Sequence, residues 1–171
     1  MQVQHNTFTM HLEELPLDIG YASEKVTVKD KEGNSHLIGG QNGKTQLFIT
    51  APFVDEALLE ELRTIEKDLP NGGEYEVTAS LILAHILEDD LDMEKIKLFC
   101  DDQEQFSDFY GVKLSGKPYE GELTKAIILI SKDGAIFYDE FVTDLDHKFN
   151  QETLLRKIYA AQTCYTGKGC H

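Results

Sequence analysis

Two cysteines near the carboxyl end of the chain are the residues whose spacing most directly permits chemistry. Cys164 and Cys170 flank a Gly-Lys-Gly segment, and a flexible loop of this kind lets two Cα atoms approach within the roughly 4.4–6.8 Å that a disulfide needs. Lys168 and His171 add positive charge, which lowers the pKa of a nearby thiol and favours the thiolate required for exchange. Residues 163–171 therefore form a candidate redox tail.

Two other interpretations of this tail remain open. It could be a chain end that carries two thiols without using them. It could also bind zinc, because Cys164, Cys170 and His171 supply three suitable ligands and a fourth could come from elsewhere or from a second chain. The other histidines show no metal-ligand spacing, and we expect no resident metal or cofactor.

The third cysteine, Cys100, ends an apolar run at residues 95–100, which indicates a buried, inert thiol. Three cysteines are too few for a secreted disulfide scaffold. Residues 1–10 are polar and lack the features of a signal peptide, and no apolar run approaches the roughly 20 residues of a membrane-spanning helix. We therefore expect a cytoplasmic protein with reduced thiols.

The charge of the chain limits its partners. The 171 residues include 31 acidic and 16 basic ones, for a formal net charge of −15. Such a surface repels phosphate backbones and anionic lipid headgroups, so neither nucleic acid nor a membrane is an expected partner. We expect the acidic clusters at residues 88–90 and 101–102 to be solvated loops.

The first half of the chain alternates strand signals with turns. Residues 7–12 alternate in hydrophobicity and predict a first hairpin, and a second is expected around the turn at residues 31–34. Residues 45–50 form a compact apolar run, typical of a strand buried on both faces. From Asp55 the apolar positions recur at helical spacing until the breaker residues at 70–73.

The second half predicts a strand at 75–79, a short apolar helix at 81–87, and a strand at 95–100. His85 falls within that helix and is expected to be a core or boundary residue. A short helix near 105–110 precedes a hairpin about the Lys132-Asp133-Gly134 turn, with apolar strands at 126–130 and 135–138. A last helix follows at about 150–162. The order βαβαβ implies parallel pairing of the first three core strands.

This order of elements resembles the thiol peroxidase group of the peroxiredoxins. The similarity rests on a proline after the core strand, on residues 15–20, on the Phe-Tyr-Gly-Val step at 109–112 and on the Lys-Asp-Gly hairpin, and it covers roughly residues 5–162. It implies an α/β, thioredoxin-like (peroxiredoxin-type) fold, in which helices flank a central mixed sheet and an extra β-hairpin precedes it. We expect one domain at 1–162, the tail at 163–171, and a homodimer.

The same resemblance places the family's reactive positions on residues that cannot react. In that group the proline is followed four residues later by a Thr and three residues after that by the peroxide-reacting Cys, and an Arg opens a later strand. The matching residues here are Pro52, Glu56, Leu59 and Lys125. Leu59 cannot form the thiolate that a helix N-terminus would stabilise, and Lys125 lacks the planar fork of donors of arginine. The family's resolving Cys would fall in the helix at 81–89, which has no Cys, so peroxidase activity is not expected.

Two roles are open for Glu56. A carboxylate in the first turn of a helix is favourable to the helix dipole by about 0.3–1 kcal/mol, which explains the residue structurally. The rival hypothesis is an ion pair between Glu56 and Lys125 that fills the former peroxide pocket.

Two functions follow from these observations. The first is a pseudoenzyme, a non-peroxidase interaction or regulatory module built on a thioredoxin-like scaffold. The alternative is a thiol–disulfide redox protein that acts through Cys164 and Cys170 on a protein or thiol partner.

Overall fold

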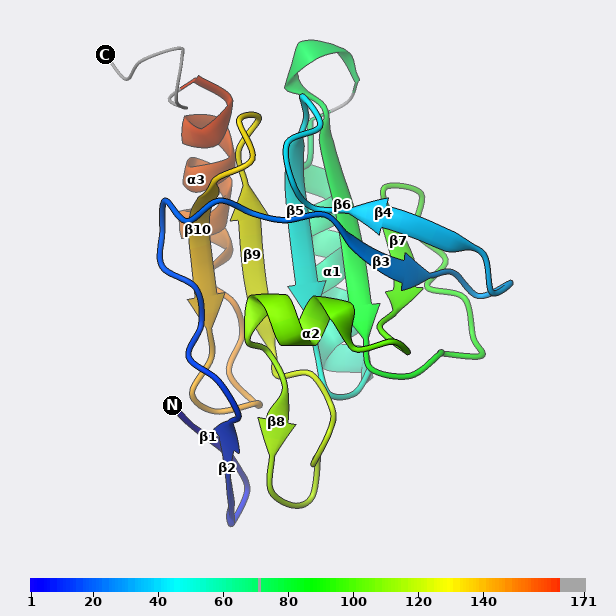
Figure 1. The fold of residues 1–171 in the computed structure, drawn as a ribbon, viewed down its shortest axis with the longest axis vertical. Helices are drawn as coiled ribbons and strands as arrows, with labels where there is room; N and C mark the ends of the chain where they lie inside the picture. Colours follow the sequence, from blue (N-terminus) through cyan, green and yellow to red (C-terminus); the bar gives the residue numbers. More distant parts are fainter. Residues whose placement is uncertain (71, 164–171) are drawn as a thin grey trace.

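The computed structural model describes residues 1–70 and 72–163, and it arranges them around a large mixed sheet (Figure 1). The order of its seven strands is β10-β9-β5-β6-β7-β3-β4, and a smaller sheet has the order β1-β2-β8. The strands are β1 (Gln2–His5), β2 (Phe8–Leu12), β3 (Val26–Lys29), β4 (Ser35–Ile38), β5 (Thr45–Thr50), β6 (Val77–Leu83), β7 (Ile96–Cys100), β8 (Leu114–Ser115), β9 (Ala126–Ile130) and β10 (Ile136–Phe141). The helices are α1 (Glu56–Asp68), the 3-10 turn η1 (Gly73–Tyr75), α2 (Gln105–Tyr110) and α3 (Gln151–Thr163).

The large sheet has one apolar core on each face. Strands β5, β6 and β7 are parallel, whereas β9 is antiparallel to β5 and β10 is antiparallel to β9. In Figure 1, α2 lies in front of the sheet and α1 lies behind it. The core behind the sheet includes residues of α1 and α3, and the core in front includes residues of α2. This is the expected α/β arrangement of a mixed sheet flanked by helices, preceded by the expected β1–β2 hairpin.

Strand β5 joins the two cores. All six of its residues are buried, as the apolar run predicted. Because side chains alternate along a strand, Leu47 and Ile49 pack with the helices α1 and α3, while Phe48 packs on the α2 side. The segment that follows β5 therefore starts from a fixed position at the carboxyl end of this central strand.

Helix α1 begins as the sequence predicted. The Asp55 side chain accepts a hydrogen bond from the backbone N–H of Leu58 at 2.8 Å, which satisfies one of the donors left free at a helix N-terminus. Leu58, Leu62 and Ile65 form the buried stripe. The helix stops at Asp68, two residues before Pro70, because proline cannot continue it.

The predicted short helix at 81–87 is wrong, because β6 runs through Leu83 and the described residues form no helix between β6 and β7. Strand β6 lies between β5 and β7 and is buried on both faces, so its apolar residues do not alternate with polar ones. A continuous apolar run of this length does not distinguish a central strand from a buried helix.

Two expectations for polar residues were also wrong. His85 is exposed, and its Nε2 lies 3.5 Å from a carboxylate oxygen of Glu122. Asp101 is buried instead of solvated, because its two carboxylate oxygens accept the backbone N–H groups of Phe106 and Ser107 at 2.9 and 2.8 Å. The carboxylate thus satisfies donors at the start of α2. Asp102 and residues 88–90 are exposed as expected.

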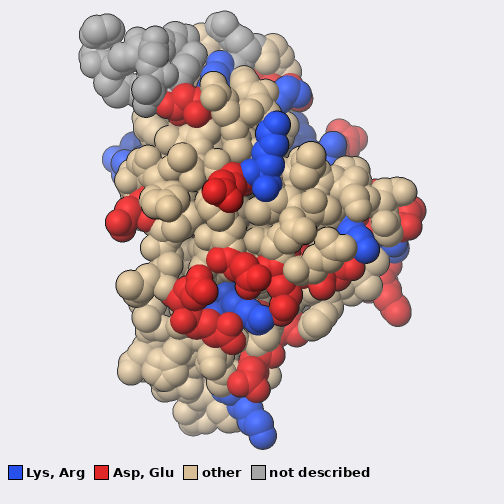
Figure 2. All heavy atoms as spheres, in the orientation of Figure 1, with Lys and Arg blue, Asp and Glu red and all other residues tan. Residues whose placement is uncertain are grey.

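The acidic composition is visible on the surface. Figure 2 shows acidic side chains gathered around basic ones on the face that carries α2. Lys113 pairs with Glu104, whose carboxylate raises the Lys113 pKa, and Glu13 and Asp108 reinforce the effect.

Among the described residues no helix is long and apolar enough to cross a membrane.

An aromatic cluster beneath α2 closes the front core. The ring of Tyr110 packs against Phe48 and Phe106, with centroids 5.8 and 4.5 Å away. Its hydroxyl lies 2.6 Å from the Ser23 hydroxyl and donates to the Glu24 carbonyl at 3.3 Å. Burial raises the pKa of Tyr110 to about 12.

The raised pKa of Tyr110 predicts that the protein loses stability at alkaline pH. Above pH 10 an unfolded tyrosine loses its proton while folded Tyr110 keeps it up to about pH 12, so the free energy of unfolding must fall as pH rises through this range. We expect Tyr110→Phe to cost about 1 kcal/mol at pH 7, because one hydrogen-bonded hydroxyl is lost, and to weaken the decline above pH 10. Denaturant unfolding at a series of pH values measures both effects. Tyr159→Phe, at a residue 72% exposed, is the matched control, and a Tyr110→Phe curve parallel to it would contradict the assignment.

Candidate functional site

The site lies where β5 ends and α1 begins. The connecting loop borders a small cavity of about 70 Å³. Residues from α1, from the start of β9 and from the segment before α3 complete its wall: Ala51, Pro52, Phe53, Asp55, Ala57, Leu58, Glu61, Lys125, Leu145, Asp146 and Lys148.

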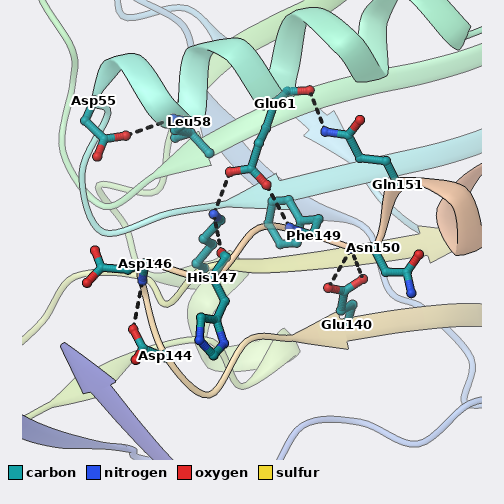
Figure 3. A network of polar contacts seen from close by, with 11 residues as sticks. Asp55, Leu58, Glu61, Glu140, Asp144, Asp146, His147, Phe149, Asn150 and Gln151 are labelled. Carbon is teal, nitrogen blue, oxygen red and sulfur yellow. Dashed lines mark hydrogen bonds and ion pairs between the residues drawn. The ribbon is translucent and has the colours of Figure 1, made fainter.

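A buried ion pair dominates this site (Figure 3). The ammonium of Lys125 donates to a carboxylate oxygen of Glu61 at 2.6 Å, and the two side chains are only 8% and 3% exposed. Lys125 donates a second hydrogen bond to the carbonyl of His147 at 2.7 Å. Its nitrogen also lies 4.9 Å from the ring centroid of Phe149, within the range of a cation–π interaction.

Glu61 is bound on its other side as well. Its second carboxylate oxygen accepts the backbone N–H of Phe149 at 2.7 Å, and its backbone carbonyl accepts the side-chain amide of Gln151 at 3.4 Å. Figure 3 shows these contacts joining α1 to the segment that leads into α3. The Glu61 carboxylate thus ties together α1, the residue that precedes β9, and the segment before α3.

Of the two roles considered for Glu56, the ion pair with Lys125 is wrong, and the position in the first turn of α1 is the one observed. Glu56 is exposed and pairs with Arg63 at 2.9 Å, and the partner of Lys125 is Glu61 instead. The helical spacing contained the signal for this, because Glu61 lies three residues after Leu58 and four before Ile65, on the buried stripe of α1. A carboxylate on an apolar stripe requires a buried partner, and Lys125 supplies it.

Pro52 and Leu59 occupy the positions expected from the order of elements. Pro52 lines the cavity. Leu59 lies in the first turn of α1, where its N–H bonds to the Asp55 carbonyl at 3.0 Å, and its side chain packs against the rear core. No thiol, hydroxyl or imidazole from the described residues lines the cavity; the ionisable side chains in its wall are carboxylates and lysines.

An aromatic group that sequence reasoning missed lies beside the cavity. His5 packs against Phe53 and Tyr119 with ring centroids 5.5 and 5.4 Å away, and those two rings are 5.0 Å apart. The Nδ1 of His5 lies 3.6 Å from a carboxylate oxygen of Asp146 and makes no hydrogen bond to any residue that the structure describes. These rings come from three distant segments, and no spacing in the sequence links them.

Cys100 is a buried free thiol at the end of β7, as predicted. Desolvation raises its pKa, and the Asp102 carboxylate adds to the shift, so its thiolate is disfavoured. Cys164, Cys170 and His171 lie outside the described residues. Within residues 1–70 and 72–163, no cluster of three or more His, Cys, Asp or Glu side chains could hold a metal ion.

Comparison with known proteins relates this fold to peroxide-reducing enzymes. No family model matches the chain. A thiol peroxidase of Aquifex aeolicus is 21% identical over 147 residues, which are 83% of this chain and 87% of that protein. The crystal structure of a peroxiredoxin-like protein from Aquifex aeolicus superposes with a TM-score of 0.84 at 17% identity, covering 94% of this chain and 96% of that one. A thiol peroxidase from Chromobacterium violaceum gives a TM-score of 0.76 at 17% identity, with 94% and 97% covered. The predicted thioredoxin-like, peroxiredoxin-type fold is thereby confirmed.

Because Glu61 and Lys125 bind each other, the effects of replacing them on the free energy of unfolding should not be additive. Glu61→Gln keeps an acceptor for Phe149 but leaves the Lys125 charge unbalanced, and Lys125→Met leaves the Glu61 charge unbalanced. Each should cost about 3–5 kcal/mol of unfolding free energy. The double variant carries neither charge and should cost clearly less than the sum of the two.

Denaturant unfolding measures this cycle, and Glu56→Gln is its matched control because the exposed pair with Arg63 is worth about 0–1 kcal/mol. Strictly additive effects of Glu61→Gln and Lys125→Met would show that the two side chains do not interact as the geometry indicates.

Proposed function

We propose that this chain is a non-peroxidase relative of the thiol peroxidases that serves as an interaction or regulatory module. The observation that carries the proposal is the Glu61–Lys125 pair. In the enzymes that the sequence resembles, a guanidinium at the position of Lys125 orients peroxide. Here the ammonium is 8% exposed and donates to Glu61 and His147, so it is not available to a substrate.

The start of α1 supports the same proposal. A peroxide-reducing thiolate depends on free N–H groups and on the positive end of a helix dipole. At this helix the Asp55 carboxylate takes the N–H of Leu58, and Glu56 adds a second negative charge in the first turn. With Leu59 at the position of the nucleophile, neither the reacting atom nor its electrostatic support is present.

The proposal predicts no turnover of peroxide. Purified protein with an excess of a dithiol reductant should consume hydrogen peroxide no faster than the reductant alone. Leu59→Cys should acquire only the slow reaction of an ordinary thiol, because Lys125 stays bound to Glu61. Peroxide consumption by the unsubstituted protein that scales with its concentration, and that persists in a Cys164→Ser/Cys170→Ser variant, would refute the proposal.

In a second candidate function, the chain carries out thiol–disulfide chemistry through the cysteines of residues 163–171. Its support is the pair Cys164 and Cys170 with adjacent Lys168 and His171, together with the burial of Cys100, which leaves that thiol unsuited to exchange. Under this alternative the partner is a protein or small thiol.

A redox titration separates the two functions. In graded dithiol buffers, with alkylation and peptide mapping, a two-electron transition of Cys164 and Cys170 between about −200 and −290 mV would support the alternative. The interaction module predicts no such transition. In either case Cys100 should be alkylated slowly in the native protein and rapidly in denaturant, and that behaviour serves as the internal control.

We further propose a cytoplasmic homodimer, with the surface near Pro52 and Leu59 close to the partner copy. The support for the dimer is the resemblance in fold, and the support for the location is a cysteine content too low for a secreted disulfide scaffold. Sedimentation equilibrium tests the oligomeric state.

A further inference from the structure

Strand β4 is the edge of the large sheet, and it carries backbone groups that pair with nothing in the part of the chain that the structure describes. It is the last strand in the order and pairs with β3 alone. Figure 1 shows the β3–β4 hairpin lying across the front of the sheet near β7. Among the described residues, no backbone hydrogen bond reaches β4 from outside this hairpin.

The register identifies which groups are free. In an antiparallel pair, residues with both backbone groups facing the partner alternate with residues facing away. Thr27 is opposite Leu37, and the N–H of Thr27 faces away from β4, because it donates to the side chain of Gln105 at 2.9 Å. Leu37, and Ser35 two residues before it, therefore direct their N–H and C=O groups outward from the sheet.

The other edge of the sheet is covered at the start of its edge strand, β10. On β10, the N–H of Ile136 donates to the carbonyl of Tyr21 at 2.9 Å, and its carbonyl accepts the N–H of Gly20 at 2.7 Å. A free edge is a template for another strand, and proteins usually cover it or guard it with charge or proline. The sequence Ser-His-Leu-Ile of β4 has neither lysine nor proline.

A cleft of about 470 Å³ lies beside β4, between the hairpin and the front of the sheet. Its lining includes Phe48 and Phe99, and the ring of His36 packs on Phe99 with centroids 4.9 Å apart. Ile38 adds a further apolar wall. Phe48 and Phe99 are nearly buried, so a strand added to β4 would have space for its side chains and would meet Ile38 as an accessible apolar contact.

The charged residues around the cleft indicate which charge a partner should carry. Lys44, Lys95 and Lys97 line it together with Glu76 and Glu94, so its walls carry more positive than negative charge in a chain of net charge −15. Lys44 pairs with Glu76 at 3.4 Å. Lys97 is exposed and forms no ion pair with a described residue, which leaves its charge available to an acidic group.

We propose that the free edge of β4 and the adjoining cleft bind an extended peptide segment of a partner protein, which adds a strand to the sheet. This names the partner class for the interaction module and rests on that proposed function. The segment pairs its backbone with Ser35 and Leu37. It places an apolar side chain against Ile38 in the cleft and carries an acidic residue that reaches Lys97. Backbone pairing supplies the affinity and the side-chain pockets supply the specificity.

The probe is a fluorescent nine-residue synthetic peptide in which valine alternates with glutamate and threonine, titrated by fluorescence anisotropy. We expect saturable binding, with the amide resonances of Ser35 and Leu37 shifting in NMR spectra. Leu37→Pro removes the outward N–H without touching the β3 pairing, since proline is tolerated on an edge strand, and should weaken binding by at least about tenfold. Leu37→Ala keeps the N–H and is the matched control, with a much smaller loss.

A peptide N-methylated at alternate residues removes donors from the ligand instead of the protein, so the test stands even if Leu37→Pro unfolds. It should bind at least about tenfold more weakly than the parent peptide. Failure of the parent peptide to bind at about 1 mM would overturn the proposal. So would binding that Lys97→Ala weakens but N-methylation leaves unchanged, because the cleft would then take a ligand without strand addition.

A concentration-dependent dimer of the unsubstituted protein that Leu37→Pro abolishes would also overturn the proposal, because a second copy would then occupy the edge. Peroxide turnover, in contrast, refutes the proposed function but does not alter the outcome of these binding measurements. The two failures are therefore distinguishable.

Discussion

The contact on which the site depends is the buried hydrogen-bonded pair of Glu61 and Lys125. Two opposite charges removed from water are tolerated only when each finds the other together with further polar partners. Here the carboxylate has Lys125 and the N–H of Phe149, and the ammonium has Glu61 and the carbonyl of His147. Because those groups belong to α1, to the start of β9 and to the segment before α3, the pair fixes three parts of the chain relative to one another.

This pair also determines what the site can do. A lysine engaged by a carboxylate at 2.6 Å and a carbonyl at 2.7 Å is a structural cation, and no thiol, hydroxyl or imidazole of the described residues lines the small cavity beside it. The end of β5, which positions a reacting group in the enzymes of similar fold, here positions Leu59 against the core. In the proposed function, this region holds α1, Lys125 and the segment before α3 together, and the proposed binding surface lies elsewhere, at the β4 edge.

The sequence predicted most of the fold because its strongest signals are local. The Asp55 cap, the stripe from Leu58 to Ile65 and the Lys-Asp-Gly turn each fix an element through contacts a few residues apart. The error at residues 81–87 arose where local signals are ambiguous, since a central strand buried on both faces has the same apolar composition as a buried helix. His85 was misplaced with that helix, and Asp101 was misplaced because acidic composition alone does not show that its carboxylate binds the N–H groups at the start of α2.

The site was less predictable than the fold. The resemblance indicated Lys125 correctly as a residue of the pocket, but it suggested Glu56 as the partner, and the structure assigns Glu61. Helical periodicity alone could have favoured Glu61, whereas the ring group of His5, Phe53 and Tyr119 has no sequence signal. The free groups of Ser35 and Leu37 likewise required the strand register.

The most direct test of this account is NMR observation of the side-chain ammonium of Lys125 in ¹⁵N-labelled protein near neutral pH. An ammonium buried and hydrogen-bonded to Glu61 and His147 exchanges its protons slowly with water, so its ¹H–¹⁵N signal should be visible and should be lost or strongly shifted in Glu61→Gln. Exposed lysines such as Lys97 should give no such signal. Absence of a protected ammonium, or one that Glu61→Gln leaves unchanged, would contradict the claim that this pair has replaced the reactive pocket.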